Sequence, residues 1–285
     1  MSQKKVIVAS DSTCDLGEAL IQKYGIKIVP LMVHLGEKDY IDGVDVTPDD
    51  IYAYYERTGE LPKTAAPTIA DFEMFFKEQT ALGNAVVLFT LSSTMSATYH
   101  NALLAAEELE DVYVVDSQNL STGGGLLVLT ACEMAAAGKS AEEIFHACEA
   151  LRSQVDASFV VDNLEFLHKG GRCSAVAAFG ANLLQLKPCI MVTDGKMGVG
   201  KKYRGKFGAV LEKYVAERIG DGSTIDLHRV FVTHAGCDMS IVEACVAQVK
   251  ALAPFEEVLI TRAGCTISSH CGRNTLGVLF LRKDS

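Results

Sequence analysis

The chain of 285 residues lacks any uninterrupted apolar run that approaches the roughly 18–20 residues of a membrane span, so we expect no stable membrane insertion. Its first ten residues hold too few apolar side chains for a signal peptide and are better explained as a first β-strand. No Cys-x-x-Cys pair occurs among the nine cysteines, which disfavours zinc and thioredoxin-like redox sites. We predict a cytoplasmic protein with reduced thiols. Five of these cysteines we interpret as buried small hydrophobes: Cys14, Cys132, Cys148, Cys189 and Cys245.

Two signatures of catalysis are also missing. The chain has no Gly-x-Ser-x-Gly nucleophile elbow, and its main hydroxyl-rich loop contains no glycine-rich phosphate cradle.

The formal net charge of −10 argues against general nucleic-acid binding. The charge is uneven, however, because residues 169–206 carry eight basic side chains against the single acid Asp194. This segment is either a solvated loop edge or a docking patch for an acidic or phosphorylated partner.

What remains is the composition of an ordinary globular protein, with 49% apolar and 22% charged residues. In residues 1–156, short apolar strands alternate with helices, which predicts a parallel sheet covered on both faces. In residues 157–285 the pattern changes to a mixed sheet with helices mostly on one face. We therefore predict an α/β fold of two domains, a three-layer α/β/α domain and a two-layer α/β domain. Segment 30–45 is a candidate to pack with the second domain.

The most informative stretch is 85–99, where an apolar strand leads into a cluster of hydroxyls and then into a helix. Five hydroxyl side chains fall within seven positions, more than helix capping requires. Hydroxyls and free N–H groups at a helix start form a seat for an anion, and ligands of parallel sheets usually bind at the carboxyl ends of strands. The cluster therefore favours binding a carboxylate over breaking a bond. Its hydroxyls belong to Ser92, Ser93, Thr94, Ser96 and Thr98.

Three further polar segments are candidates for the same site. Residues 63–67 form a proline-bounded extended loop, residues 168–172 a flexible basic turn, and residues 267–277 a polar loop between two strands. In the last of these, His270 stands close to glycine and arginine, which favours a ligand site. We also expect a helix over 175–186, rich in small residues, that lines a tunnel or packs in the core.

In their order and spacing, six segments resemble the DegV family of bacterial fatty-acid-binding proteins, over essentially the whole chain. The resemblance implies a two-domain fold that buries a long-chain fatty acid, such as palmitate, in a tunnel between the domains. It implies a binding protein without catalytic residues, metal or cofactor. The segments are Val8–Leu16, Pro62–Thr68, Leu91–Tyr99, Val115–Ser117, Leu167–Arg172 and His270–Asn274.

By this resemblance, Thr64 and Ser96 hold the carboxylate and His270 lies close by. The family includes the acyl-binding subunits of the bacterial fatty acid kinase, which present the bound acid to a separate catalytic subunit. Arg172 and Arg204 would then contact such a partner. The implied role is lipid transport or presentation in fatty acid metabolism.

The sequence departs from the family pattern at three places near the head group. Ala65 and Ala66 replace a hydroxyl and an amide, and Ala97 places a Cβ where the family has glycine. Arg273 replaces a proline, before Asn274, which can adopt a left-handed conformation. We therefore count Ala97 and Arg273 among the ligand contacts.

Burying an acyl chain contributes about 0.8 kcal/mol per CH₂, provided that the carboxylate finds hydrogen-bond partners. Three alternatives to a fatty-acid carrier stay open. A serine hydrolase using Ser96 and His270 would need an acid to orient the histidine. A small-molecule-binding subunit related to dihydroxyacetone kinase would need a polar pocket. A regulatory interaction protein would contain only a vestigial pocket.

Overall fold

The apolar runs of the first half of the chain form a four-stranded parallel sheet in the computed structural model, which describes residues 4–176 and 186–283. Its strand order is β2-β1-β6-β7, and each pairing is parallel. All six residues of β6 are buried, as expected for a strand covered on both faces. The strands are β1 Val6–Asp11, β2 Lys27–Val29, β6 Ala85–Thr90 and β7 Val112–Asp116.

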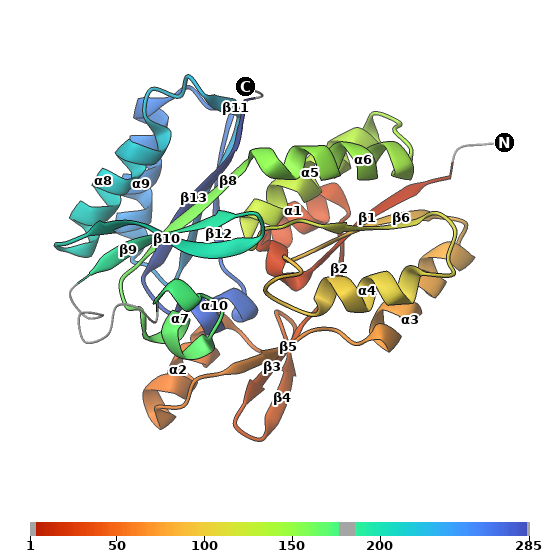
Figure 1. Ribbon diagram of the computed structural model, residues 1–285, viewed down its shortest axis with the longest axis horizontal. Coiled ribbons are helices and arrows are strands. Elements are labelled where there is room, and N and C mark those ends of the chain that lie inside the picture. Colours follow the sequence, from red (N-terminus) through yellow and green to blue (C-terminus); the bar gives the residue numbers. More distant parts are fainter. Residues whose placement is uncertain (1–3, 177–185, 284–285) are drawn as a thin grey trace.

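Helices cover both faces of this parallel sheet (Figure 1). Phe72 and Ala102 of α3 and α4 pack on one face, whereas Leu127 and Ile144 of α5 and α6 pack on the other. The predicted three-layer α/β/α arrangement is thereby confirmed. The elements are η1 Ser12–Cys14, α1 Gly17–Tyr24, α3 Ile69–Ala81, α4 Thr98–Ala106, α5 Thr122–Ala136, α6 Ala141–Leu151 and η2 Arg152–Gln154.

The strands of the second half form a mixed sheet of order β10-β9-β8-β13-β11-β12. Strands β11 and β12 pair in parallel, and the other neighbours pair antiparallel. Leu211 of α8 and Val249 of α9 pack on one face, which confirms the predicted two-layer arrangement. The elements are β8 Val155–Val161, β9 Lys187–Thr193, β10 Lys196–Tyr203, α8 Phe207–Ile219, β11 Ile225–Ala235, α9 Met239–Leu252, β12 Glu257–Arg262 and β13 Thr275–Arg282.

A third sheet, of order β4-β3-β5, includes the proline-bounded segment that we predict as a loop. That segment forms strand β5, which pairs antiparallel with β3. Val33 of β3 and Tyr52 of α2 pack with Cys265 of α10, and the assignment of segment 30–45 to a domain stays a prediction. The elements are β3 Met32–Leu35, β4 Lys38–Ile41, α2 Pro48–Thr58, β5 Lys63–Ala65, α7 Glu165–Gly170 and α10 Cys265–Cys271.

With Thr47, Thr68 and Ser140 as caps, the sequence predicts helices that begin at residues 48, 69 and 141, and all three starts are confirmed. Thr47, Thr68 and Ser140 each accept a hydrogen bond from the N–H of the third helical residue. The acidic side chain of that residue accepts the N–H of the cap in return, which completes a capping box. These starts of α2, α3 and α6 are therefore fixed by residues close together in the sequence.

Elsewhere, tertiary contacts override the local pattern. Residues 168–170 belong to helix α7 rather than to a flexible turn, because Phe166 and Leu167 of that helix are buried. His270 belongs to helix α10 rather than to a loop. Residues 196–203 form strand β10, an element absent from our prediction. The helix expected over 175–186 falls almost entirely outside the described residues.

The sequence predicts a polar, glycine-rich turn over residues 117–125 and a helix from residue 126, whereas helix α5 begins at Thr122 and includes three glycines in its first turn. Glycine disfavours helix, so the sequence pattern predicts a turn there. The structure explains these glycines by close packing. A Cβ on Gly125 would lie 2.8 Å from the carbonyl oxygen of Cys14, and a Cβ on Gly123 would lie 2.1 Å from Oδ1 of Asn119.

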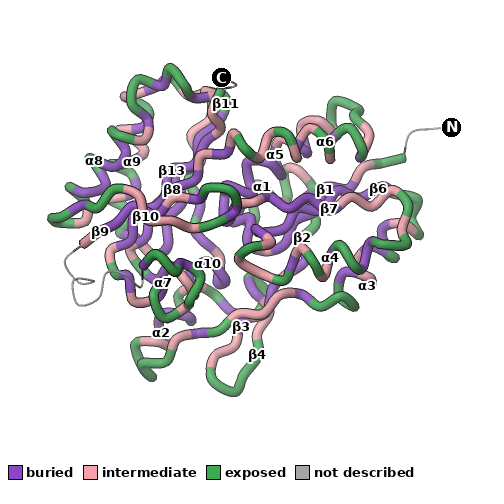
Figure 2. The backbone as a smooth tube through the Cα atoms, in the orientation of Figure 1, coloured by how far each residue is buried: buried purple, intermediate pink, exposed green. Residues whose placement is uncertain are grey.

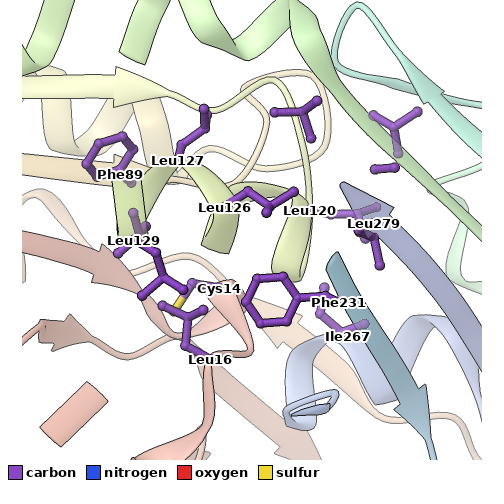
Figure 3. Packing of buried hydrophobic residues seen from close by; sticks show 14 of the residues in the cluster. Cys14, Leu16, Phe89, Leu120, Leu126, Leu127, Leu129, Phe231, Ile267 and Leu279 are labelled. Atoms are coloured by element: carbon purple, nitrogen blue, oxygen red, sulfur yellow. The ribbon is translucent and has the colours of Figure 1, made fainter. Parts of the chain in front are cut away.

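One hydrophobic cluster joins the parallel and mixed sheets (Figure 3). It contains Phe89 of β6, Leu126 of α5, Phe231 of β11 and Ile267 of α10. Figure 2 shows buried residues along the strands on both sides of this junction. Strand β8 spans the boundary between residues 156 and 157, and the division into two domains there stays a prediction.

All nine cysteines are free and buried. Among the residues that the structure describes, no helix is long and apolar enough to span a bilayer. Nor does the described part of the chain gather three His, Cys, Asp or Glu side chains in a way that could hold a metal ion.

We predict that Gly125→Ala lowers the free energy of unfolding by about 1–3 kcal/mol, although alanine is the better helix former by about 1 kcal/mol. The new methyl group would collide with the backbone carbonyl of Cys14. Urea unfolding followed by circular dichroism measures the change. Gly124→Ala is the matched control, because its Cβ would meet the hydroxyl of Ser117 at an ordinary 3.5 Å. Equal stability of the two variants would contradict this explanation.

Candidate functional site

A cavity of about 330 Å³ lies between helix α10 and the loops at the carboxyl ends of the parallel strands. The loops after β2, β6 and β7 contribute Leu31, Leu91 and Leu120 to its wall. The volume is at the lower end of the range of small-molecule sites. Most of the lining is aliphatic or sulfur-containing: Leu31, Thr64, Ala65, Ala66, Leu91, Met95, Ser96, Ala97, Leu120, Arg172, Met197, Thr266, Ile267, His270 and Cys271.

Thr64 and His270 meet in this cavity although 206 residues separate them in the sequence. Oγ1 of Thr64 lies 2.8 Å from Nε2 of His270. Strand β5 places Thr64 by pairing it with Val33 of β3, and helix α10 places His270. The structure therefore brings together two of the predicted site residues, on a strand and a helix rather than on two loops.

Ser96 and Ala97 line the cavity at the start of helix α4. Ala97 is the N-cap residue and has no side-chain group to accept an N–H. Oγ of Ser96 lies 2.8 Å from Oγ1 of Thr98 and accepts the N–H of Thr98 at 3.3 Å. The positive end of the α4 dipole thus lies beside a hydroxyl at the cavity wall.

Other hydroxyls of the 92–98 cluster are used to join the two sheets. Oγ of Ser92 and Oγ1 of Thr94 donate to the carbonyl oxygen of Gly195, at 2.8 and 2.5 Å. Gly195 lies in the turn between β9 and β10 of the mixed sheet. The hydroxyl cluster therefore has two roles. Ser96 contributes to the cavity wall, whereas Ser92 and Thr94 connect the two halves of the chain.

The imidazole of His270 is held in its neutral form. Burial, reinforced by the positive charge of Arg172, lowers the pKa of His270 to about 4. Its Nδ1 atom is buried and has no hydrogen-bond partner among the described residues. This atom packs on Gly170, where a Cβ would lie only 2.9 Å away. The polar end of the cavity therefore offers hydroxyls, a neutral ring and one nearby guanidinium.

Arg172, which we predict to contact a partner protein, lines the cavity and is also exposed. Its Nη1 donates to the carbonyl oxygen of Gly170 at 2.8 Å, which places the side chain beside the last turn of α7. Arg204 is exposed between β10 and α8 and does not contribute to the cavity wall. Its contact with a partner stays a prediction.

The structure places Arg273 away from the cavity, so we remove it from the set of ligand contacts. Its guanidinium carbon lies 4.5 Å from the centroid of the Tyr52 ring, and its Nε lies 3.5 Å from Oε1 of Glu56. Gly272, with a φ of +73°, redirects the chain directly after α10. Asn274 adopts the expected left-handed conformation, with a φ of +55°.

Most of the apolar wall is formed by residues that are not among the predicted site residues. Met197 lies in β10, and Ile267 lies in the part of α10 that we predict as a polar loop. The available signal was the presence of single apolar side chains within otherwise polar segments. Periodicity over such short stretches is too weak to assign them to a cavity.

The chain matches known proteins over nearly its whole length, both in sequence and in fold. A family model described as the DegV family matches residues 5–283. The chain belongs to the DegV family. A DegV domain-containing protein of Clostridium acetobutylicum is 32% identical over 282 residues, which cover 98% of this chain and 99% of that protein.

Solved structures of DegV proteins share the fold described above. A DegV family protein of Thermus thermophilus, described as fatty acid binding, has a TM-score of 0.88 and 32% identity, and the match covers 98% of this chain and 100% of that one. A stearic acid-binding protein of Eubacterium ventriosum has a TM-score of 0.84 and 28% identity, with 99% of each chain covered. The predicted α/β fold class is thus that of the DegV family.

For this DegV chain we predict that His270 titrates near pH 4 and that Arg172→Ala raises its pKa toward the ordinary 6.5, since a repelling charge is removed. NMR titration of the imidazole protons measures both values. Arg204→Ala, outside the cavity, is the matched control and leaves the pKa unchanged. Titration of the wild-type ring at its ordinary value would contradict the buried, neutral state.

The same shift predicts a pH dependence of stability. The pKa of His270 is lower in the folded chain than in the unfolded chain, so its contribution is fully present above pH 6.5 and is lost as the pH falls through about 4. Between pH 6.5 and about pH 4, the free energy of unfolding should therefore fall less in His270→Asn than in the wild type.

Proposed function

We propose that the chain binds a long-chain fatty acid such as palmitate, with the carboxylate at Thr64, Ser96 and His270 and the alkyl chain between the two sheets. The observation that carries this proposal is an apolar cavity in which Thr64 and His270 form a hydrogen-bonded pair 2.8 Å long. The stearic acid bound by the Eubacterium ventriosum protein and the fatty acid binding of the Thermus thermophilus protein support this ligand class.

The head group is stabilised by donors without a buried ion pair. If Nε2 of His270 carries the proton, it donates to Thr64 Oγ1, and the Thr64 hydroxyl is free to donate to a carboxylate oxygen. The Ser96 hydroxyl and the start of α4 supply a second donor and a favourable field. Such donors lower the free energy of a carboxylate that would otherwise be costly to bury.

The tail has a path along helix α10. A second, smaller cavity of about 30 Å³ shares Leu120, Ile267 and Cys271 with the first, and its wall is continued by Phe159 and Leu279 of the mixed sheet. An alkyl chain directed this way enters the hydrophobic cluster between the sheets. Each buried CH₂ adds about 0.8 kcal/mol, so the tail supplies most of the affinity and the head group supplies the orientation.

The geometry gives less support to the alternatives. In the described part of the chain the hydrogen-bond partners of Ser96 Oγ are Thr98 atoms, whereas His270 pairs with Thr64, so no nucleophile–base pair is formed. Burial raises the pKa of the Cys271 thiol to about 12, which leaves it unreactive. The aliphatic wall disfavours a polar sugar-like ligand, and the open volume disfavours a vestigial pocket.

We further propose a cytoplasmic carrier without cofactor that presents its fatty acid to a separate fatty acid kinase subunit. Arg172 is exposed where it also lines the cavity, and Arg204, Lys196 and Lys206 are exposed along the same basic segment. A positive surface beside the carboxylate is suited to a partner that brings a phosphoryl donor.

The experiment is to denature the purified protein and identify released lipids by mass spectrometry. We expect a stoichiometric long-chain fatty acid in the wild type. For the delipidated variant Thr64→Ala/Ser96→Ala we expect a dissociation constant for added fatty acid at least about tenfold higher than for the delipidated wild type, which corresponds to about 1.4 kcal/mol. The matched control is Thr80→Ala/Ser153→Ala, since these hydroxyls bond only to backbone carbonyls of their own helical segments. A wild-type protein that is empty and takes up no added fatty acid would refute the proposal.

A further inference from the structure

Helix α10, which carries His270, begins without a capping side chain of its own, because its N-cap residue is Gly264. The first N–H groups of a helix need acceptors from elsewhere. The N–H of Gly264 donates to Oδ1 of Asp15 at 2.8 Å. The N–H groups of Cys265 and Thr266 donate to Oδ1 and Oδ2 of Asp42 at 2.9 and 3.1 Å. Two carboxylates from remote parts of the chain therefore complete the start of α10.

Asp42 gathers two further donors on Oδ2, the hydroxyls of Thr266 at 2.6 Å and Ser12 at 3.0 Å. Asp15 also accepts the hydroxyl of Ser121, which precedes α5. All the partners of Asp42 are donors, so a side chain with two acceptor oxygens suits that position better than an amide. At Asp15, burial raises the carboxyl pKa to about 8, so this group accepts from Gly264 and Ser121 without having to be ionised.

The packing around these carboxylates is tight. Asp15 is 5% exposed and Asp42 is 4% exposed. A Cβ on Gly264 would lie 3.1 Å from Oδ1 of Asp15 and 3.6 Å from Oδ1 of Asp42, so glycine is what lets the chain approach them. A buried carboxylate that lost its donors would be costly, which fixes the start of α10 in one place.

The segment that supplies Asp42 also supplies the partner of His270. Asp42 directly follows β4, and Thr64 lies in β5 of the same three-stranded sheet. Asp42 binds the first turn of α10, and Thr64 binds His270 near its last residue. The short helix is thus attached to one small sheet at both ends.

We propose that Asp42 and Asp15 are positioning residues for the head-group site: they fix the start of α10 and thereby the place of His270 relative to Thr64 and Ser96. The inference rests on the proposed function. It also gives a role to Asp15. This residue lies in the segment Val8–Leu16, which resembles the family pattern but contributes no residue to the cavity wall.

The test compares two ligands of equal chain length, palmitate and hexadecanol, by titration calorimetry. A misplaced His270 weakens recognition of the carboxylate but not of the tail. We expect Asp42→Asn to weaken palmitate binding by about tenfold or more while hexadecanol binding changes by less than about twofold. Asp238→Asn is the matched control, because Asp238 caps α9 through the N–H of Ser240 and that helix lies outside the cavity.

A double-mutant cycle separates positioning from general destabilisation. If Asp42 acts through His270, Asp42→Asn/His270→Ala binds palmitate no more weakly than His270→Ala alone. Fully additive losses, or equal losses for palmitate and hexadecanol, would overturn the positioning role. If Asp42→Asn does not fold, Ser12→Ala removes one of the bonds to Asp42 from outside the cavity wall and should weaken palmitate binding selectively, to a smaller extent.

The result also distinguishes this inference from the function on which it rests. A wild-type protein that binds palmitate no better than hexadecanol would refute the proposed head-group site. A wild type that prefers palmitate, with an unchanged preference in Asp42→Asn and Ser12→Ala, would refute the positioning role alone.

Discussion

The hydrogen bond between Thr64 and His270 is the contact on which the site depends, because it joins the small three-stranded sheet to the helix that closes the cavity. A carboxylate can be buried beside an apolar chain only where donors are already in place. Here the donors are held by elements from distant parts of the sequence: β5 holds Thr64, the start of α4 holds Ser96, and α10 holds His270. Their convergence makes a mostly apolar cavity suitable for a fatty acid.

The same arrangement adds no buried charge at His270, and the guanidinium of Arg172 at the cavity wall is exposed. His270 is neutral because its surroundings are buried and Arg172 is close, so the cavity adds hydrogen bonds without adding a buried cation. The hydrophobic cluster behind the cavity is shared by both sheets (Figure 3), which provides an apolar continuation from the polar end toward Phe159 and Leu279. In the proposed complex, the polar end orients the fatty acid and the apolar continuation supplies most of the affinity.

Helices and strands could be predicted from the sequence where residues close together in the chain determine them. The capping boxes at Thr47, Thr68 and Ser140 identify three helices, and the buried run 85–90 identifies the central strand. They could not be predicted where contacts between residues far apart in the chain determine the local structure. Helix α10 consists of residues with weak helix propensity, and its start is stabilised by Asp42, 223 residues away from Cys265. The expectation that His270 lies close to Thr64 came from family resemblance. Arg273, which follows Gly272 with its φ of +73°, does not line the cavity.

Carbon-13 NMR of palmitate labelled at the carboxyl carbon would test the proposed head-group site most directly. The complex would be titrated from about pH 8 to about pH 3, across the ordinary carboxyl value near 4.3. Hydrogen bonds to the charged form lower a carboxyl pKa, so we expect the bound acid to stay ionised below that ordinary value. A bound carboxyl that titrates near pH 6 or above, as for a group desolvated without donors, would contradict binding at Thr64, Ser96 and His270.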